Sequence, residues 1–160
     1  MKFLSTILIL VLISIDYQTK ALINTSLTMN ESLKVNEYLL FQKFYNKGIA
    51  FSMFDSSSVF VNFIILLLIL IIIIILLRYF YIQFNSLNKI EVLSFCLIIG
   101  GAIGNVIDRI QNGYVLDFIY ISFYQYYFPA VFNMADLFIS SGVILLLITY
   151  YRNKDAHDKA

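Results

Sequence analysis

Two aspartates, Asp117 and Asp136, are the residues most suited to chemistry in this sequence. Neither has an Arg, Lys or His three or four residues away that would neutralise it on a helix. Two carboxylates in a partly dry site tend to share one proton. One then acts as a general base toward water while its protonated partner polarises a carbonyl, which suffices for peptide hydrolysis. Spacing alone is equally consistent with a structural role for each aspartate.

Other polar residues are spaced so that they can pair with one another. Asp16 and Lys20 are four residues apart, and Asn105, Asp108 and Arg109 fall on one helical face. By default we expect these groups to satisfy each other and to hold neighbouring helices in register. The remaining candidates are Asn46, Gly48 and Asn133. An amide such as Asn46 and a permissive backbone such as Gly48 suit either an extended substrate or a tight turn.

Several kinds of chemistry have no signal here. The only cysteine, Cys96, lies in an apolar run and is expected to pack as a small apolar residue. The only histidine, His157, lies in the polar tail, which argues against a Ser-His or Cys-His centre within a membrane. No HExxH motif and no glycine-rich phosphate loop are present, so zinc and nucleotide chemistry are not indicated. The net charge of +1 gives no basis for nucleic-acid binding.

Composition determines the environment of these residues. Of the 160 residues, 61% are apolar and 13% charged, whereas soluble domains are about 25% charged. A helix needs about 20 apolar residues to cross a bilayer. Four stretches qualify, at about 3–23, 59–77, 92–110 and 132–151. They predict a single polytopic membrane domain over 1–160. The expected fold is all-α, with an outer segment that includes a small β-element. The first stretch resembles a signal peptide, but no small-x-small cleavage site follows it, so we expect it to be retained.

The basic residues predict an orientation. Those close to the span ends fall on one side, which the positive-inside rule assigns to the cytoplasm; they are Lys2, Arg78, Lys89, Arg152 and Lys154. Both termini are then cytoplasmic, the segments 24–58 and 111–131 lie outside, and the polar cluster lies toward the outer face. Gly100, Gly101 and Gly104 predict a close helix approach in the third span.

Five motifs in chain order resemble the lipoprotein signal peptidase family, also called signal peptidase II. They are Asp16–Lys20, Asn46–Ser52 with its Asn-x-Gly-x-Ala-Phe signature, Gly100–Arg109, Gly113–Phe118 and Phe132–Asp136. Each string is weak by itself, but five in order over four spans form a specific signal. Tyr17, Val131 and Leu137 depart from the family's usual pattern and bear on geometry and substrate preference.

The resemblance implies an aspartic endopeptidase with Asp117 and Asp136 as its catalytic dyad. It implies supporting roles for other motif residues: Asp16, Asn46, Asn105, Asp108, Arg109 and Asn133. It implies diacylglyceryl-modified prolipoproteins as substrates, cut just before the lipidated cysteine, in the bacterial inner membrane. Family members need no metal or organic cofactor, and membrane lipids are the expected surroundings.

Two alternative functions belong to other classes. Intramembrane carboxylates also mark ion or proton pathways, although the cytoplasmic halves of these spans carry no such groups. A metal-dependent lipid-headgroup enzyme would use Asp108, Asp117 and Asp136 as oxygen ligands, and sensitivity to a chelator would distinguish it from a peptidase.

Overall fold

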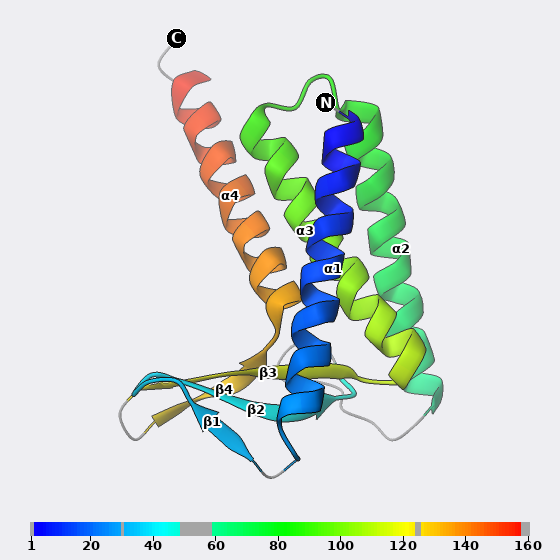
Figure 1. Ribbon diagram of the computed structural model, residues 1–160. Helices are drawn as coiled ribbons and strands as arrows, with labels where there is room; N and C mark the ends of the chain where they lie inside the picture. Colours follow the sequence, from blue (N-terminus) through cyan, green and yellow to red (C-terminus); the bar gives the residue numbers. More distant parts are fainter. Residues whose placement is uncertain (1, 30, 49–58, 124–125, 158–160) are drawn as a thin grey trace.

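The computed structural model describes residues 2–29, 31–48, 59–123 and 126–157. Four long helices stand on a small antiparallel sheet (Figure 1). The helices are α1 (Lys2–Ser26), α2 (Val59–Gln83), α3 (Lys89–Asn112) and α4 (Met134–His157). The strands are β1 (Ser32–Lys34), β2 (Leu39–Asn46), β3 (Val115–Phe123) and β4 (Tyr126–Phe132).

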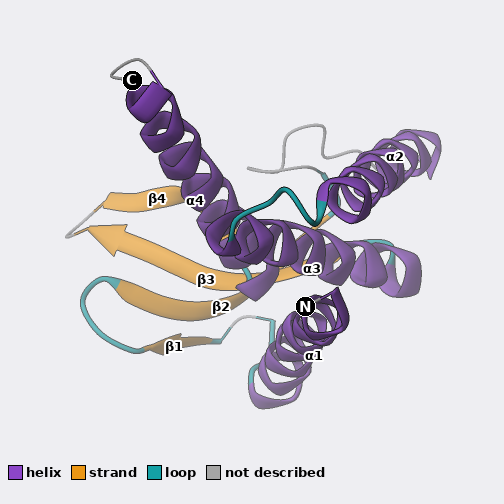
Figure 2. Cartoon of the chain, turned by 90° about the horizontal axis from the view of Figure 1, so that it is seen from above, coloured by secondary structure: helices purple, strands orange, loops and turns teal. Residues whose placement is uncertain are grey.

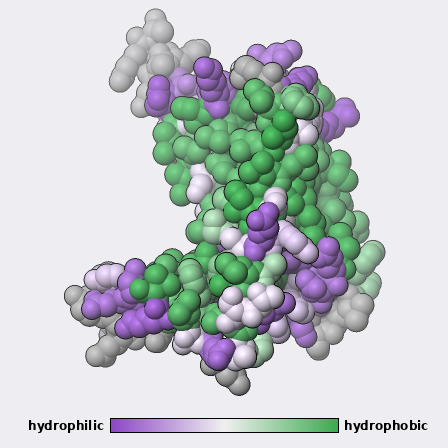
Figure 3. Space-filling view, in the orientation of Figure 1, coloured by the Kyte–Doolittle hydropathy of each residue, from purple (hydrophilic) through white to green (hydrophobic). Residues whose placement is uncertain are grey.

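All four helices are long and apolar enough to cross a membrane. On the face shown in Figure 3, mostly apolar residues cover the helices, and hydrophilic residues gather at the helix ends remote from the sheet and over the sheet. The predicted fold of four membrane helices with a small β-element is therefore confirmed, and the chain is a multi-pass membrane protein.

Helix α3 is the centre of the bundle and packs against α1, α2 and α4 (Figure 2). A capping box at Asn88 starts it, and Gly113 ends it in the left-handed conformation with φ 79°. Cys96 is fully buried among the apolar side chains between the helices, as expected. A Cβ on Gly101 would collide with the carbonyl oxygen of Ala135, which accounts for the glycine at this α3–α4 crossing.

The sheet has the order β1-β2-β3-β4, with every pair antiparallel. Its apolar side chains, including Leu116 and Phe118, pack against Ile23 near the end of α1. In the β3–β4 pair, Tyr120 lies opposite Val131 and Ser122 lies opposite Tyr127, so three residues of β4 face one of β3. This irregularity is a β-bulge on the β4 side of the pair.

One helix starts two residues later than the approximate span predicted from the sequence. The fourth span was expected from residue 132, but Phe132 pairs with Ile119 in β4 and α4 begins at Met134. The backbone N–H of Asp136 donates to Asn133 Oδ1 at 3.0 Å, so Asn133 caps the helix and sets its start. The other three predicted spans lie within α1, α2 and α3.

Candidate active site

The position of Asp117 follows from the alternation of side chains between the two faces of β3. Its neighbours Leu116 and Phe118 pack into the apolar cluster below α1, so the carboxylate between them points to the other face of the strand. There it is 2% exposed. Asn46 Nδ2 donates to its Oδ2 at 2.8 Å, and Asn133 Nδ2 donates to its Oδ1 at 2.6 Å. Both oxygens of this carboxylate are therefore held by neutral amides.

Asp136 lies in the first turn of α4. Its Oδ2 accepts the backbone N–H of Asn133 at 3.0 Å, which completes a reciprocal cap with that residue. Its Oδ1 accepts Asn105 Nδ2 at 2.8 Å from α3. A negative charge at this position is also stabilised by the partial positive charge of the helix N-terminus.

Asn133 connects the two carboxylates. It is fully buried, its side-chain amide donates to Asp117, and its backbone donates to Asp136. Its Nδ2 also donates to Asn105 Oδ1 at 3.0 Å. One asparagine thus fixes the end of a strand, the start of a helix and the spacing of two acids.

Both carboxylates border one cavity of about 380 Å³. Its apolar wall comes from α2, α3 and α4 through Ile69, Ala102 and Ile139, and its sheet wall comes from Ala130 and Val131. Asn46, Asn105 and Arg109 supply the other polar groups. The cavity can accommodate a short length of apolar chain with a polar bond directed at the two acids.

Burial raises the pKa of Asp117 to about 7, and the nearby charge of Asp136 adds to this rise. The hydrogen bonds from Asn46 and Asn133 oppose it. Near neutral pH Asp117 therefore carries a proton part of the time, as acid–base work by a carboxylate pair requires.

Comparison with known proteins identifies the family. A family profile described as signal peptidase (SPase) II matches residues 8–152. The chain is 38% identical over 141 residues to the lipoprotein signal peptidase of Francisella tularensis subsp. mediasiatica, covering 88% of this chain and 87% of that protein. It is 36% identical over 157 residues to the one of Clostridium tetani, covering 96% of each.

The chain belongs to the signal peptidase II family. It is an aspartic endopeptidase that removes signal peptides from prolipoproteins. The solved structure of a bacterial membrane enzyme matches with a TM-score of 0.77 and 32% identity, covering 94% of this chain and 88% of that one. A second solved structure with the same description matches with a TM-score of 0.78 and 31% identity, covering 91% of each.

The supporting residues of this signal peptidase II chain pair partly as the sequence predicted: the Asp16–Lys20 pair is present, and Asp108 and Arg109 have partners on other elements. Lys20 Nζ does lie 2.7 Å from Asp16 Oδ2 on its own helix. Asp108 pairs with Lys20 across helices at 3.0 Å and also accepts the backbone N–H of Leu116. Arg109 instead donates to the carbonyl oxygen of Gly48 at 2.8 Å. Helical spacing in the sequence predicted the pair within one helix. The partners on other elements became visible only in the tertiary structure.

The carboxylates of the alternative metal site do not converge in this signal peptidase II fold. Asp108 borders a separate cavity from the one that holds Asp117 and Asp136. In the part of the chain that the structure describes, no three His, Cys, Asp or Glu side chains are grouped so as to hold a metal ion.

The second family motif is described only in part. Gly48 donates its N–H to Asn46 Oδ1 at 2.9 Å, so these two residues form a turn, which is one of the two roles that the sequence left open for them. Residues 49–52 of the motif lie outside the described residues. Sequence reasoning did not foresee that Asn46 contacts Asp117 directly, since antiparallel pairing of β2 with β3 brings them together. Ala130 and Val131 were also missed as cavity-lining residues, because apolar residues in a strand carry no chemical signal.

Proposed function

We propose that Asp117 and Asp136 are the catalytic dyad of this peptidase. One observation carries the proposal: the buried carboxylate of Asp117 and the half-buried carboxylate of Asp136 border the same cavity and share Asn133 as a hydrogen-bond donor. The residue types, their burial and the raised pKa of Asp117 are those that aspartic proteolysis requires.

The two acids divide the steps of hydrolysis. The charged carboxylate takes a proton from water as the water oxygen attacks the scissile carbonyl carbon, and the protonated carboxyl donates its proton to the carbonyl oxygen. When the tetrahedral intermediate collapses, the leaving nitrogen takes the proton that the first carboxylate removed from water, and the carbon–nitrogen bond breaks. The second carboxylate takes its proton back from the former carbonyl oxygen, so both acids return to their starting states. Asn46, Asn105 and Asn133 keep the acids in place throughout, since each donates to one of them.

The proposed substrate is a diacylglyceryl-modified prolipoprotein, cut just before the lipidated cysteine. The cavity supports this because its wall of α2, α3 and α4 residues is apolar, while Asp117 and Asp136 lie where the helices meet the sheet. A diacylglyceryl chain can then remain in lipid while the peptide bond reaches the acids.

We further propose that the protein resides in the bacterial inner membrane with both termini cytoplasmic and the dyad toward the outer face. Lys2, Arg78, Lys89 and Arg152 lie near the helix ends remote from the sheet. Positive charge near span ends favours the cytoplasmic side.

The decisive experiment compares a lipidated precursor with the same precursor lacking the lipid, each incubated with purified enzyme in detergent and followed by mass spectrometry. We expect one cut, immediately before the modified cysteine, in the lipidated precursor alone. Equal turnover of the unlipidated precursor would contradict the substrate proposal. A chelator arm should leave the rate unchanged, and loss of activity there would favour the metal-dependent alternative.

A further inference from the structure

Lys20 is a buried cation with three acceptors from two helices. Its side chain is 5% exposed, and its Nζ lies 2.7 Å from Asp16 Oδ2 and 3.0 Å from Asp108 Oδ2. The third contact, at 3.0 Å, is to Asn105 Oδ1. An ammonium has three N–H groups, so each has one acceptor. The third N–H is directed at Asn105, which in turn donates to Asp136 of the proposed dyad.

The contact with Lys20 fixes the orientation of the Asn105 amide. Asn105 Oδ1 accepts from Lys20 and from Asn133 Nδ2, so its own Nδ2 must face Asp136 Oδ1, 2.8 Å away. A flipped amide would place its NH₂ against the ammonium and its oxygen against the carboxylate. Both contacts would be repulsive, so the charge of Lys20, together with the Asn133 amide, sets which group of Asn105 faces Asp136.

The two acids differ in what stabilises a negative charge. Asp136 lies at the N-terminus of α4 and accepts a hydrogen bond from the Asn105 amide, which Lys20 polarises. Asp117 receives two amides, from Asn46 and Asn133, and the oxygen of each accepts a neutral backbone N–H, from Gly48 and Asp136 respectively. A neutral donor polarises an amide less than an ammonium does.

We infer that Lys20 is a positioning residue of the dyad, which acts through Asn105 to hold Asp136 as the charged carboxylate and so leaves the shared proton on Asp117. This inference rests on the proposed dyad and adds the division of roles within it. The pKa of Asp117, raised to about 7 mainly by burial, agrees with its role as the protonated partner.

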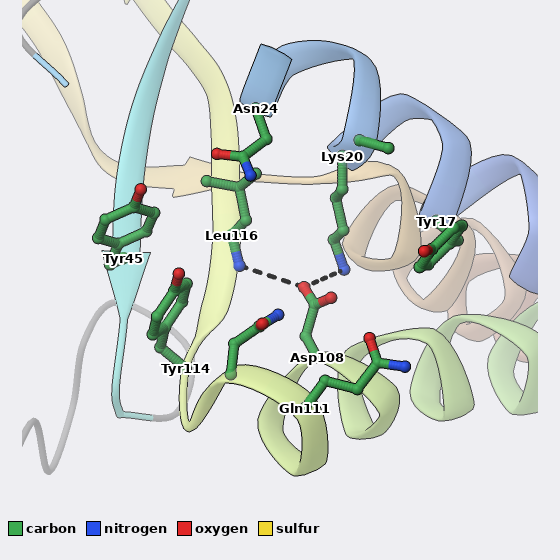
Figure 4. Close-up of a pocket in the computed structure, with 10 residues that line it drawn as sticks. Tyr17, Lys20, Asn24, Tyr45, Asp108, Gln111, Tyr114 and Leu116 are labelled. Atoms are coloured by element: carbon green, nitrogen blue, oxygen red, sulfur yellow. Dashed lines mark hydrogen bonds and ion pairs between the residues drawn. The ribbon is translucent and has the colours of Figure 1, made fainter. Parts of the chain in front are cut away.

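Lys20 acts from a cavity separate from that of the dyad. The cavity in Figure 4 has a volume of about 190 Å³ and lies among α1, α3 and the sheet, with Lys20 and Asp108 on its wall. Lys20 does not line the dyad cavity. Its removal should therefore affect the charge of the dyad and leave substrate contacts in place. The charged and titratable groups around it are Asp16 and Tyr17 on α1, Tyr45 on β2, Asp108 and Arg109 on α3, Tyr114, Asp117 and Asp136.

The test is the pH–rate profile of the double variant Asp16→Asn/Lys20→Gln. The two new amides can pair with each other, and the amide oxygen at position 16 can still accept the backbone N–H of Ala135, so local packing is retained. Removal of the ammonium should shift the acid limb of kcat/KM upward by on the order of one pH unit. At a fixed pH below that limb the rate then falls about tenfold with KM unchanged.

The matched control is Asp16→Asn alone, which keeps the ammonium. Its acid limb should stay in place or move to lower pH, because a nearby negative charge is removed. A double variant that loses rate without any shift of its pH profile would overturn the inference. Loss of a purely structural residue lowers the rate at every pH and leaves the apparent pKa values of the profile unchanged.

A second measurement applies even if the double variant fails to fold. Isotope-edited infrared spectra of aspartate-labelled protein report the protonated carboxyl directly, without any cleavage. At mildly acidic pH the acid carbonyl band should disappear in Asp117→Asn and persist in Asp136→Asn. The reverse result would overturn the division of roles while leaving the dyad intact. Substantial cleavage by Asp136→Asn would instead refute the proposed dyad itself.

Discussion

At the residue scale, three asparagines organise the chemistry of this site. Asn46, Asn105 and Asn133 donate to the two carboxylates at 2.6–2.8 Å, and none of them can take up or release a proton at ordinary pH. In the proposed mechanism they orient the two acids without competing for the proton that these acids share. Such neutral donors also satisfy buried carboxylate oxygens that would otherwise lack partners.

The first prediction concerns the dyad as a unit. Asp117→Asn and Asp136→Asn should each abolish nearly all cleavage, because an amide keeps the shape of the side chain and loses its proton transfer. The double variant should be hardly slower than either single variant, since residues that act together are strongly non-additive. Cleavage of a lipidated precursor measures this, with protein level in membranes as the control. Substantial turnover by either well-folded single variant would exclude the dyad.

The second prediction concerns stability and pH. Folding raises the pKa of Asp117 from 3.8 to about 7, so between these values the unfolded chain binds fewer protons and the folded state loses stability as pH rises. Asp117→Asn lacks this titration. Its new NH₂ group faces an amide donor from Asn46 or Asn133, and the cost of that contact does not depend on pH. Relative to wild type, the variant should therefore gain stability by up to about 4 kcal/mol from pH about 4 to 7. Thermal unfolding in detergent measures the difference, and a constant offset would contradict it.

At the element scale, glycine allows α3 and α4 to approach closely beside Asp136. Gly101 meets the carbonyl of Ala135, the residue before Asp136, and Gly142 meets the carbonyl of Ser94 farther along the same helix pair. A Cβ at either glycine would lie closer to these oxygens than van der Waals contact allows, so either alanine must separate the backbones.

The third prediction uses these two glycines as a matched pair. Gly101→Ala and Gly142→Ala should each destabilise the protein by about 1–3 kcal/mol through overpacking. Only Gly101→Ala should also lower kcat in the fraction that remains folded, because it displaces the first turn of α4 and with it Asp136. Thermal unfolding and turnover per folded molecule separate the two effects. Equal loss of turnover in both variants would show that the whole helix pair controls the dyad.

At the scale of the whole molecule, the sheet lies at one end of the bundle, and the start of α1 and the end of α4 lie at the other. Helix α1 begins and α4 ends remote from the sheet, while Asp117 and Asp136, the proposed dyad, lie where the helices meet the sheet (Figure 1). The proposed orientation therefore places water-exposed basic residues on one side of the membrane and proteolysis on the other.

The fourth prediction tests that orientation. Reporter domains fused after Lys159 or inserted between Tyr79 and Lys89 should be cytoplasmic, and one inserted near Gln111 should be external, because the basic residues flank the first group of sites. Alkaline phosphatase and fluorescent-protein fusions distinguish the two sides. An external C-terminus would contradict the orientation.

The sequence by itself determined the four helices, because crossing a bilayer requires long apolar runs that composition reveals directly. It also singled out Asp117 and Asp136, since unpaired carboxylates beside apolar segments are costly and few. The tertiary structure decided which groups meet: Asn46 reaches Asp117 only through strand pairing, and Asp108 reaches Lys20 only through helix packing. It also placed the start of α4 at Met134, where a strand and a cap replaced two residues of the expected span. Long apolar runs in the sequence indicate which segments cross the membrane. Contacts between segments far apart in the sequence depend on strand register and helix packing, which no local sequence pattern specifies.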